Sequence, residues 1–362
     1  MQSTQSKCNI KFRLALASVM LLGLAGCSFP SHININGPGP TLPVTPAAAE
    51  SVYVIQNPAT FGSGSGTILQ FLSTDTGAAT PKSTITAPAN TSFGSVGTDG
   101  SGNIYVTANS ATTLDLREYS VGSTGSATPI RLLPSNNTTM MWAPDGIDVS
   151  AAGEIFVSED TGGVADYSAT ATGSIAPTRY ILGASQTGGG LSTLVAANAV
   201  AADSSGNLYI MNEGAPGLMP ICVFAPTDNG NVAPTRTIGG ANTMIETMGG
   251  LATDSVGNFY ISNTTSNSDG TYTGSVLEFA PTATGNVAPI RTISGSSTQL
   301  GKLGGIKVDS TGNIFVVSTD STGENPTILE FSELATGNAT PTLSFTSTAW
   351  TNPDNNVSIA VF

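Results

Sequence analysis

Residues 279–289 read FAPTATGNVAP and contain the spacing that decides the fold: an aromatic residue, a Gly six positions later and a Pro four positions after that. This spacing occurs six times without insertions, and successive aromatic residues lie 48, 48, 57, 55 and 52 positions apart. A period of about 50 residues with strand-type sequence indicates a repeat architecture, for which a β-propeller is the leading candidate. The copies are Phe71/Gly77/Pro81, Tyr119/Gly125/Pro129, Tyr167/Gly173/Pro177, Phe224/Gly230/Pro234, Phe279/Gly285/Pro289 and Phe331/Gly337/Pro341.

A second motif, Asp-x-x-Gly-Asn, joins two short β-type runs in most repeats, as in DSTGNIF at residues 309–315. Asp at such a turn accepts hydrogen bonds from backbone N–H groups, while Gly and Asn tolerate positive φ. Calcium binding is the alternative, although each loop offers one carboxylate and Ca²⁺ takes about six or more oxygen ligands. The turn residues are Asp99, Asp203, Asp254 and Asp309, and the copy at 150–156 is degenerate.

Together the motifs define four strands per repeat, which we call A to D from the centre of the ring outwards. Small residues before the turn Asp suit a crowded inner strand A, and the Pro suits an exposed outer strand D. The repeats begin with a strand B at 51–55 and end with a strand A at 358–362. The sequence therefore predicts an all-β, six-bladed β-propeller with four-stranded blades over residues 51–362, closed by pairing of the C-terminal strand with the N-terminal blade.

Strands C and D of a repeat are expected to form a hairpin centred on the Thr-Gly pair. This symmetry predicts that acidic residues of strand C face arginines of strand D. Such cross-strand ion pairs contribute about 0.2–1 kcal/mol each. The alternative is a ring of arginines that binds an anion. The predicted pairs are Glu118–Arg131, Asp166–Arg179 and Glu278–Arg291, with Arg236 facing Val223 in the remaining copy.

Residues 1–26 have the pattern of an export signal. Basic residues precede an apolar stretch, 14–22, that is too short to span a bilayer. The following Leu24-Ala25-Gly26-Cys27 resembles a bacterial lipobox, which implies lipidation of Cys27 as the first residue of the mature protein. In proteins with this motif, a residue such as Ser28 favours the outer membrane. An ordinary signal peptide with a chance Cys is the alternative.

Residues 27–50 are rich in Pro and Gly and predict an extended tether between the lipid and the propeller. The formal net charge is −13, and removal of the three basic residues of the signal makes it −16. A protein with this negative charge is repelled by nucleic acid and by anionic lipid. We therefore expect the lipid anchor to be its membrane attachment. We expect a monomer facing the periplasm or the cell exterior.

The A–B motif, an apolar strand followed by Asp-Ser-x-Gly-Asn and an aromatic residue, resembles the NHL repeat over residues 51–362. More distantly, it resembles the six-bladed propellers of the gluconolactonase/senescence-marker family. NHL-type propellers mostly act as binding platforms, whereas the second family holds a divalent metal at the channel mouth with Glu, Asn and Asp. By that resemblance, Asp145 and Asn198 are candidate ligands for a divalent metal such as calcium. Turn or cap roles are the alternative, since other blades contribute Gly94, Gly249, Gly304 and Val357 at this position.

Other catalytic chemistry has little support in the sequence. The single His in the chain, His32, lies in the tether, so a His-based triad cannot form in residues 51–362. The B–C and D–A connections, such as 183–198, 263–274 and 318–326, vary in length and are expected to share one face, here called the loop face. Trp142 and Trp350 lie in D–A connections, where they are either sugar-stacking platforms or loop anchors.

These observations predict a cell-envelope lipoprotein whose propeller is a non-catalytic binding module without a cofactor. Its ligand is expected to be a protein or a carbohydrate held on the loop face. The alternative is a metal-dependent, lactonase-like hydrolase at the channel mouth.

Overall fold

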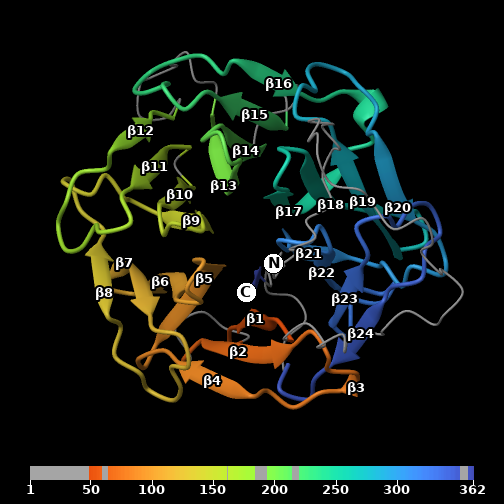
Figure 1. The fold of residues 1–362 in the computed structure, drawn as a ribbon, viewed down its shortest axis with the longest axis horizontal. Coiled ribbons are helices and arrows are strands. Elements are labelled where there is room, and N and C mark those ends of the chain that lie inside the picture. Colours follow the sequence, from red (N-terminus) through yellow and green to blue (C-terminus); the bar gives the residue numbers. More distant parts are fainter. Residues whose placement is uncertain (1–48, 59–63, 161, 184–193, 214–219, 351–357) are drawn as a thin grey trace, which may run out of the picture. The chain divides into compact units, whose positions relative to one another are not determined.

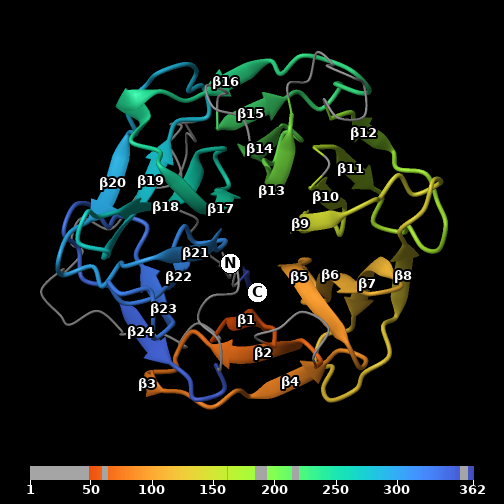
Figure 2. The same ribbon diagram turned by 180° about the vertical axis from the view of Figure 1, so that it is seen from behind.

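The computed structural model describes residues 49–58, 64–160, 162–183, 194–213, 220–350 and 358–362. These residues form six antiparallel sheets arranged as blades around a central axis (Figures 1 and 2). One 3-10 turn, η1 (Ala241–Thr243), is the single helical element among them. No helix in the described ranges is long and apolar enough to cross a bilayer. The predicted six-bladed propeller is confirmed. The candidate anchor Cys27 lies outside the described residues.

Each blade follows the A to D order that the two motifs predict. The first three blades, from the axis outwards, are β25 (Ile359–Val361), β1 (Ser51–Gln56), β2 (Thr67–Leu72) and β4 (Ser83–Thr86); β5 (Thr91–Thr98), β6 (Ile104–Ser110), β7 (Leu114–Tyr119) and β8 (Arg131–Pro134); and β9 (Pro144–Val149), β10 (Ile155–Glu159), β11 (Val164–Tyr167) and β12 (Arg179–Ile181).

The last three blades are β13 (Ala196–Ala202), β14 (Leu208–Glu213), β15 (Ile221–Phe224) and β16 (Arg236–Ile238); β17 (Thr247–Thr253), β18 (Phe259–Ser266), β19 (Tyr272–Phe279) and β20 (Arg291–Ser294); and β21 (Leu303–Val308), β22 (Ile314–Ser318), β23 (Thr327–Phe331) and β24 (Leu343–Thr346). A fifth strand, β3 (Gly77–Ala78), reaches from blade 1 to pair in parallel with β24 of blade 6. Blade 6 is thus larger than the sequence predicts.

The segment 263–274 is also more regular than predicted. It was expected to be a connection, but β18 and β19 continue through most of it and pair as far as Ser266 and Tyr272. The sequence TYT at 271–273 suits a strand, and the hydrogen bond from Tyr272 N to Ser321 O (2.7 Å) joins the hairpin to blade 6.

Ring closure follows the prediction. Strand β25 pairs with β1 in the register Val52–Val361, Tyr53–Ala360 and Val54–Ile359. Hydrogen bonds from Ser51 N to Phe362 O (2.7 Å) and from Phe362 N to Ser51 O (2.9 Å) extend the ladder. One blade is therefore built from both ends of the described chain.

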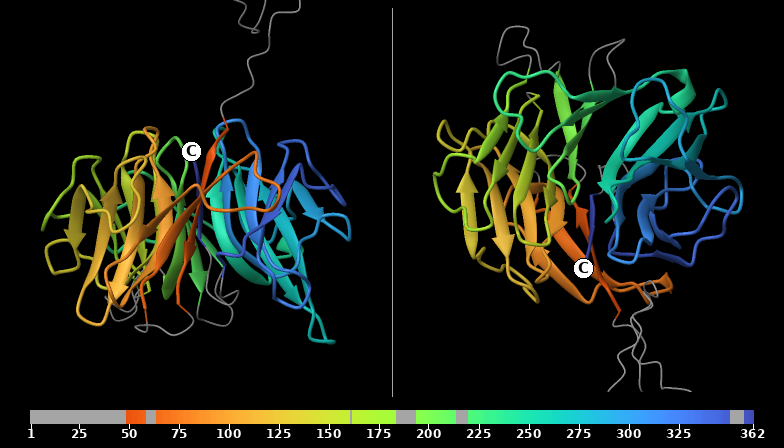
Figure 3. Two further views of the ribbon diagram at one scale, coloured as in Figure 1. Left: turned by 90° about the horizontal axis from the view of Figure 1, so that it is seen from below. Right: turned by 45° about the horizontal axis from the view of Figure 1, so that its top comes forward.

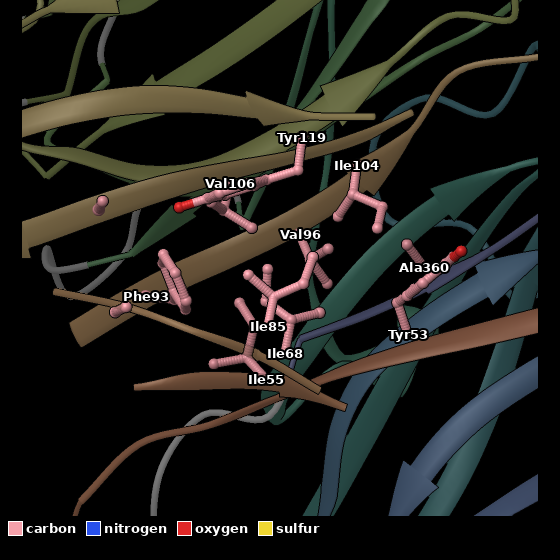
Figure 4. Close-up of a cluster of buried hydrophobic side chains, with 12 residues drawn as sticks. Tyr53, Ile55, Ile68, Ile85, Phe93, Val96, Ile104, Val106, Tyr119 and Ala360 are labelled. Carbon is pink, nitrogen blue, oxygen red and sulfur yellow. The ribbon is translucent and has the colours of Figure 1, made fainter. Parts of the chain in front are cut away.

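The core lies between the blades rather than at the axis. Buried apolar side chains form six clusters, one at each junction between neighbouring blades. Figure 4 shows the cluster between blades 1 and 2, where Ile68, Phe93 and Tyr119 meet. In strand A, small residues allow the inner strands to approach closely: a Cβ on Gly249 would lie 2.3 Å from Leu303 O of the next blade. This contact explains the small residues before the turn Asp.

Candidate functional site

The inner strands surround a cavity of about 280 Å³ on the ring axis. Strands β5, β9, β13, β17 and β21 each shift register against strand B near their start. Such bulges redirect side chains and are frequent near binding sites. Asp145 lies in the irregular part of β9, and Asn198 lies in that of β13. Both residues line the cavity, as the repeat alignment predicts.

The candidate ligands sit on strands that are in direct contact. A Cβ on Gly146 would lie 2.8 Å from Asn198 O, so Gly at this position lets β9 and β13 pack closely. Asp145 is also fixed through its main chain, because the Thr107 hydroxyl of blade 2 donates a hydrogen bond to Asp145 O (3.1 Å). The equivalent Gly94 and Gly249 line the same cavity, whereas Val357 lies outside the described residues.

The candidate ligands supply one carboxylate and one amide side chain to this cavity. Two ligand residues are fewer than the full protein shell of a typical Ca²⁺ site, so water or a ligand would have to supply the rest. Among the described residues, no group of three or more His, Cys, Asp or Glu side chains has an arrangement that could hold a metal ion. Asp145 and Asn198 therefore suit a weakly held, hydrated cation or a polar ligand.

An ion pair that the sequence analysis did not identify crosses the same channel. Lys307 Nζ of blade 6 lies 2.6 Å from Asp148 Oδ1 of blade 3, and these blades are opposite each other in the ring. Asp148 Oδ2 also accepts a hydrogen bond from Ala202 N (2.9 Å). The sequence does contain a signal for this pair. In the other four blades, the residues that match Asp148 and Lys307 are small and uncharged: Gly97, Ala201, Ala252 and Ala360. Only Asp148 and Lys307 carry charge there.

The two ends of the channel differ, because the ion pair lies toward one end and the candidate ligands lie toward the other. Asp148 follows Asp145 by three residues along β9, a distance of about 10 Å in an extended strand. The mouth with Asp145 and Asn198 lies toward the loop face, and the ion pair lies toward the opposite face, which we call the turn face because it carries the A–B and C–D turns. A ligand that approaches from the loop face therefore meets polar groups first and the ion pair at depth.

The two tryptophans differ in their surroundings. Trp350 packs on Phe71 and Phe345, with ring centroids 5.5 and 6.2 Å apart, so it anchors its connection to the core between blades 6 and 1. Trp142 is 42% exposed. The main-chain N–H of Trp142 donates a hydrogen bond to Oε2 of the fully buried Glu159 (3.2 Å), which fixes the loop that carries the exposed ring.

The acidic turn residues perform the structural role that the sequence predicts. Asp309 Oδ1 accepts hydrogen bonds from Thr311 N (2.7 Å) and Asn313 N (2.9 Å), and Oδ2 accepts one from Asn313 Nδ2 (3.0 Å). The same pattern recurs at Asp99, Asp203 and Asp254. These carboxylates hold their own turns.

No family model matches the sequence, and no curated protein matches it significantly. Among solved structures, the chain is similar to a protein of unknown function from Bacteroides caccae, with a TM-score of 0.51, 7% identity, and coverage of 87% of this chain and 99% of that one. Other matches are the WD40 β-propeller domain of Doa1 (TM-score 0.47, 11% identity, 86% and 96% coverage) and Kuenenia stuttgartiensis hydrazine synthase (0.46, 9%, 74% and 70%). At such identities the likeness concerns the fold alone.

Proposed function

We propose that this chain is a cell-envelope lipoprotein of the bacterial outer membrane whose propeller binds a ligand on its loop face without catalysis. The observation that carries the proposal is the polar mouth of the channel, where Asp145 and Asn198 open into one cavity. A propeller fold is consistent with a binding or interaction module. The loops around this mouth are the variable part of an otherwise repetitive scaffold, which is where recognition usually occurs.

The path of the chain supports this orientation. Strand β1 is a strand B, so it starts at Ser51 on the turn face (Figure 3). A tether attached through Cys27 would therefore join the propeller on the face opposite the channel mouth. Attachment at Ser51 would therefore leave the loop face free for ligands in the periplasm or outside the cell.

A carbohydrate or a protein segment is the proposed ligand. Exposed aromatic rings stack on sugars and pack on peptides, and Trp142 presents such a ring on a fixed loop. Binding of a glycan panel and of envelope-protein fractions should fall in Trp142→Ala. It should stay unchanged in Leu334→Ala, which removes an exposed apolar side chain from the turn face. Equal loss in both variants, or loss in neither, would contradict a loop-face site.

A metal-dependent, lactonase-like hydrolase is the second proposal, and the pairing of a carboxylate with an amide at the channel mouth favours it. Metal analysis and a lactone-hydrolysis assay on the purified protein test it directly. Asp145→Ala should abolish divalent-metal uptake and hydrolysis, while Asp254→Ala, in a turn of blade 5, should leave both intact. A wild-type protein that takes up no metal and cleaves no lactone would remove this alternative.

A further inference from the structure

The junctions between blades are joined by arginines in most of the ring. Arg131 pairs with Glu118 of its own blade and donates hydrogen bonds to main-chain oxygens of blade 3. Arg291 does the same between blades 5 and 6, through Glu278 and through Ala335 O (3.0 Å). The other two members of the set are Arg179 and Arg236. Four of the six junctions therefore contain a cation that links one blade to the next.

The junction of blades 6 and 1 has the acids of this network without its arginine. Glu330 occupies the strand C position, but its cross-strand partner is Leu343. In blade 2, the hydroxyl of Tyr105 contacts both the turn residue Asp99 and Arg131. Phe315 occupies the matching position in blade 6 and has no hydroxyl. Asp309 and Glu330 therefore face this junction with no arginine from their own blade.

Glu50 is bound at the place that an arginine would reach. Arg291 of blade 5 donates a hydrogen bond to the main-chain oxygen of Glu333 in blade 6. Glu333 lies two residues after the aromatic residue of strand C. The residue of blade 1 that matches Glu333 is Ser73. Glu50 holds Ser73 through two hydrogen bonds, Glu50 N to Ser73 Oγ and Ser73 N to Glu50 O, both 2.9 Å. These bonds hold Glu50 at the junction with the acidic pair of blade 6, at the place where an arginine is bound in other junctions.

We propose that Glu50, Asp309 and Glu330 form a pH-sensitive latch that holds the closing junction of the ring when Glu50 is protonated and loosens it when Glu50 is charged. Glu50 directly precedes β1, so the latch also governs how firmly the start of β1 is held. The inference does not depend on the proposed ligand or on lipidation.

The electrostatic surroundings agree with this geometry. Burial, followed by the charge of Asp309, raises the pKa of Glu50 to about 7, and burial also raises the pKa of Glu330. Neighbouring elements carry the exposed Glu333, while Lys82 pairs with Asp75 (3.2 Å). A carboxyl group whose pKa is raised by folding binds more protons in the folded state. Its stabilising contribution is complete below its ordinary pKa and is lost as the pH rises through about 7.

Thermal unfolding of the full chain between pH 6 and pH 8 tests the latch. Asp166, whose pKa burial raises to about 6, titrates at the lower end of this range in the wild type and the variants alike, so the latch is measured by the difference between them. The melting temperature of the wild type should fall across the range by about 2 °C or more. Glu50→Gln, which keeps the hydrogen-bonding shape without the titration, should remove most of this fall. The control Glu333→Gln removes an exposed carboxylate of blade 6, the blade that carries Asp309 and Glu330, and should retain the wild-type fall.

A second variant tests whether the absence of an arginine in blade 6 causes the pH dependence. Leu343→Arg gives blade 6 the arginine of the other junctions, so it should flatten the pH profile, although loss of the buried Leu343 side chain also lowers the melting temperature at every pH. At pH 8, hydrogen exchange in β1 should be several-fold slower in Glu50→Gln than in the wild type. A wild-type profile that is flat between pH 6 and 8, or one whose slope Glu50→Gln leaves unchanged, would overturn the proposal. This outcome is separate from any result on ligand binding.

Discussion

At the scale of single residues, the Gly of the repeated aromatic–Gly–Pro spacing is required by its backbone conformation. Its φ lies between +59° and +75° in all six copies. In the fifth copy, Gly285 N donates a hydrogen bond to Thr237 O of the preceding blade (2.7 Å), and a Cβ would meet no atom within 4 Å. Space is available, so the left-handed conformation is what excludes other residues. By contrast, the close contact of Gly146 with β13 leaves no room for a side chain at this position.

Gly285→Ala should therefore destabilise the propeller by about 1–2 kcal/mol, the usual cost of placing an L-residue in the left-handed region. Gly285→Asn should cost less, because Asn tolerates this conformation. Chemical unfolding of the three proteins measures the difference. A cost for Asn that equals or exceeds the cost for Ala would contradict the conformational explanation.

At the scale of elements, the register of the C–D hairpins could be predicted from the sequence. The predicted pairs Glu118–Arg131, Asp166–Arg179 and Glu278–Arg291 are all confirmed. The ion pairs also form, and the arginines reach carbonyl groups of the next blade as well. These arginines therefore have intramolecular partners, and their second role needed the tertiary arrangement to become visible.

At the scale of the whole molecule, the closing strand joins two cores. Ile359 packs in the cluster between blades 6 and 1, and the neighbouring Ala360 packs in the cluster between blades 1 and 2. A strand of three residues thus contributes to both sides of blade 1.

Removal of the last seven residues should therefore destabilise the entire ring. Burial of Ile359 alone contributes about 1.5–3 kcal/mol, and the truncation also exposes the edge of β1. We expect the melting temperature to fall by several degrees in a calorimetric scan. A truncated protein that melts within about a degree of the full chain would contradict closure by this strand.

The anchoring proposal also concerns the whole molecule. Cys27→Ala should release the protein from membranes into soluble fractions, because no other attachment is proposed. Fractionation of cells that express the two forms measures this. Persistent membrane association of the variant would indicate another anchor, whereas the stability of the propeller should be the same in both.

The sequence alone determined the number of blades, the strand order and the closure, because each depends on local spacing that recurs in every repeat. It also placed Asp145 and Asn198 at one position of the ring, and the structure puts both on one cavity. The tertiary structure alone decided contacts between repeats that differ from the pattern. The Asp148–Lys307 pair joins residues 159 positions apart, and ring closure brings Glu50, at the start of the domain, to the junction with blade 6. A repeat motif describes what the blades share, so charges that occur in one blade only acquire partners when the ring closes.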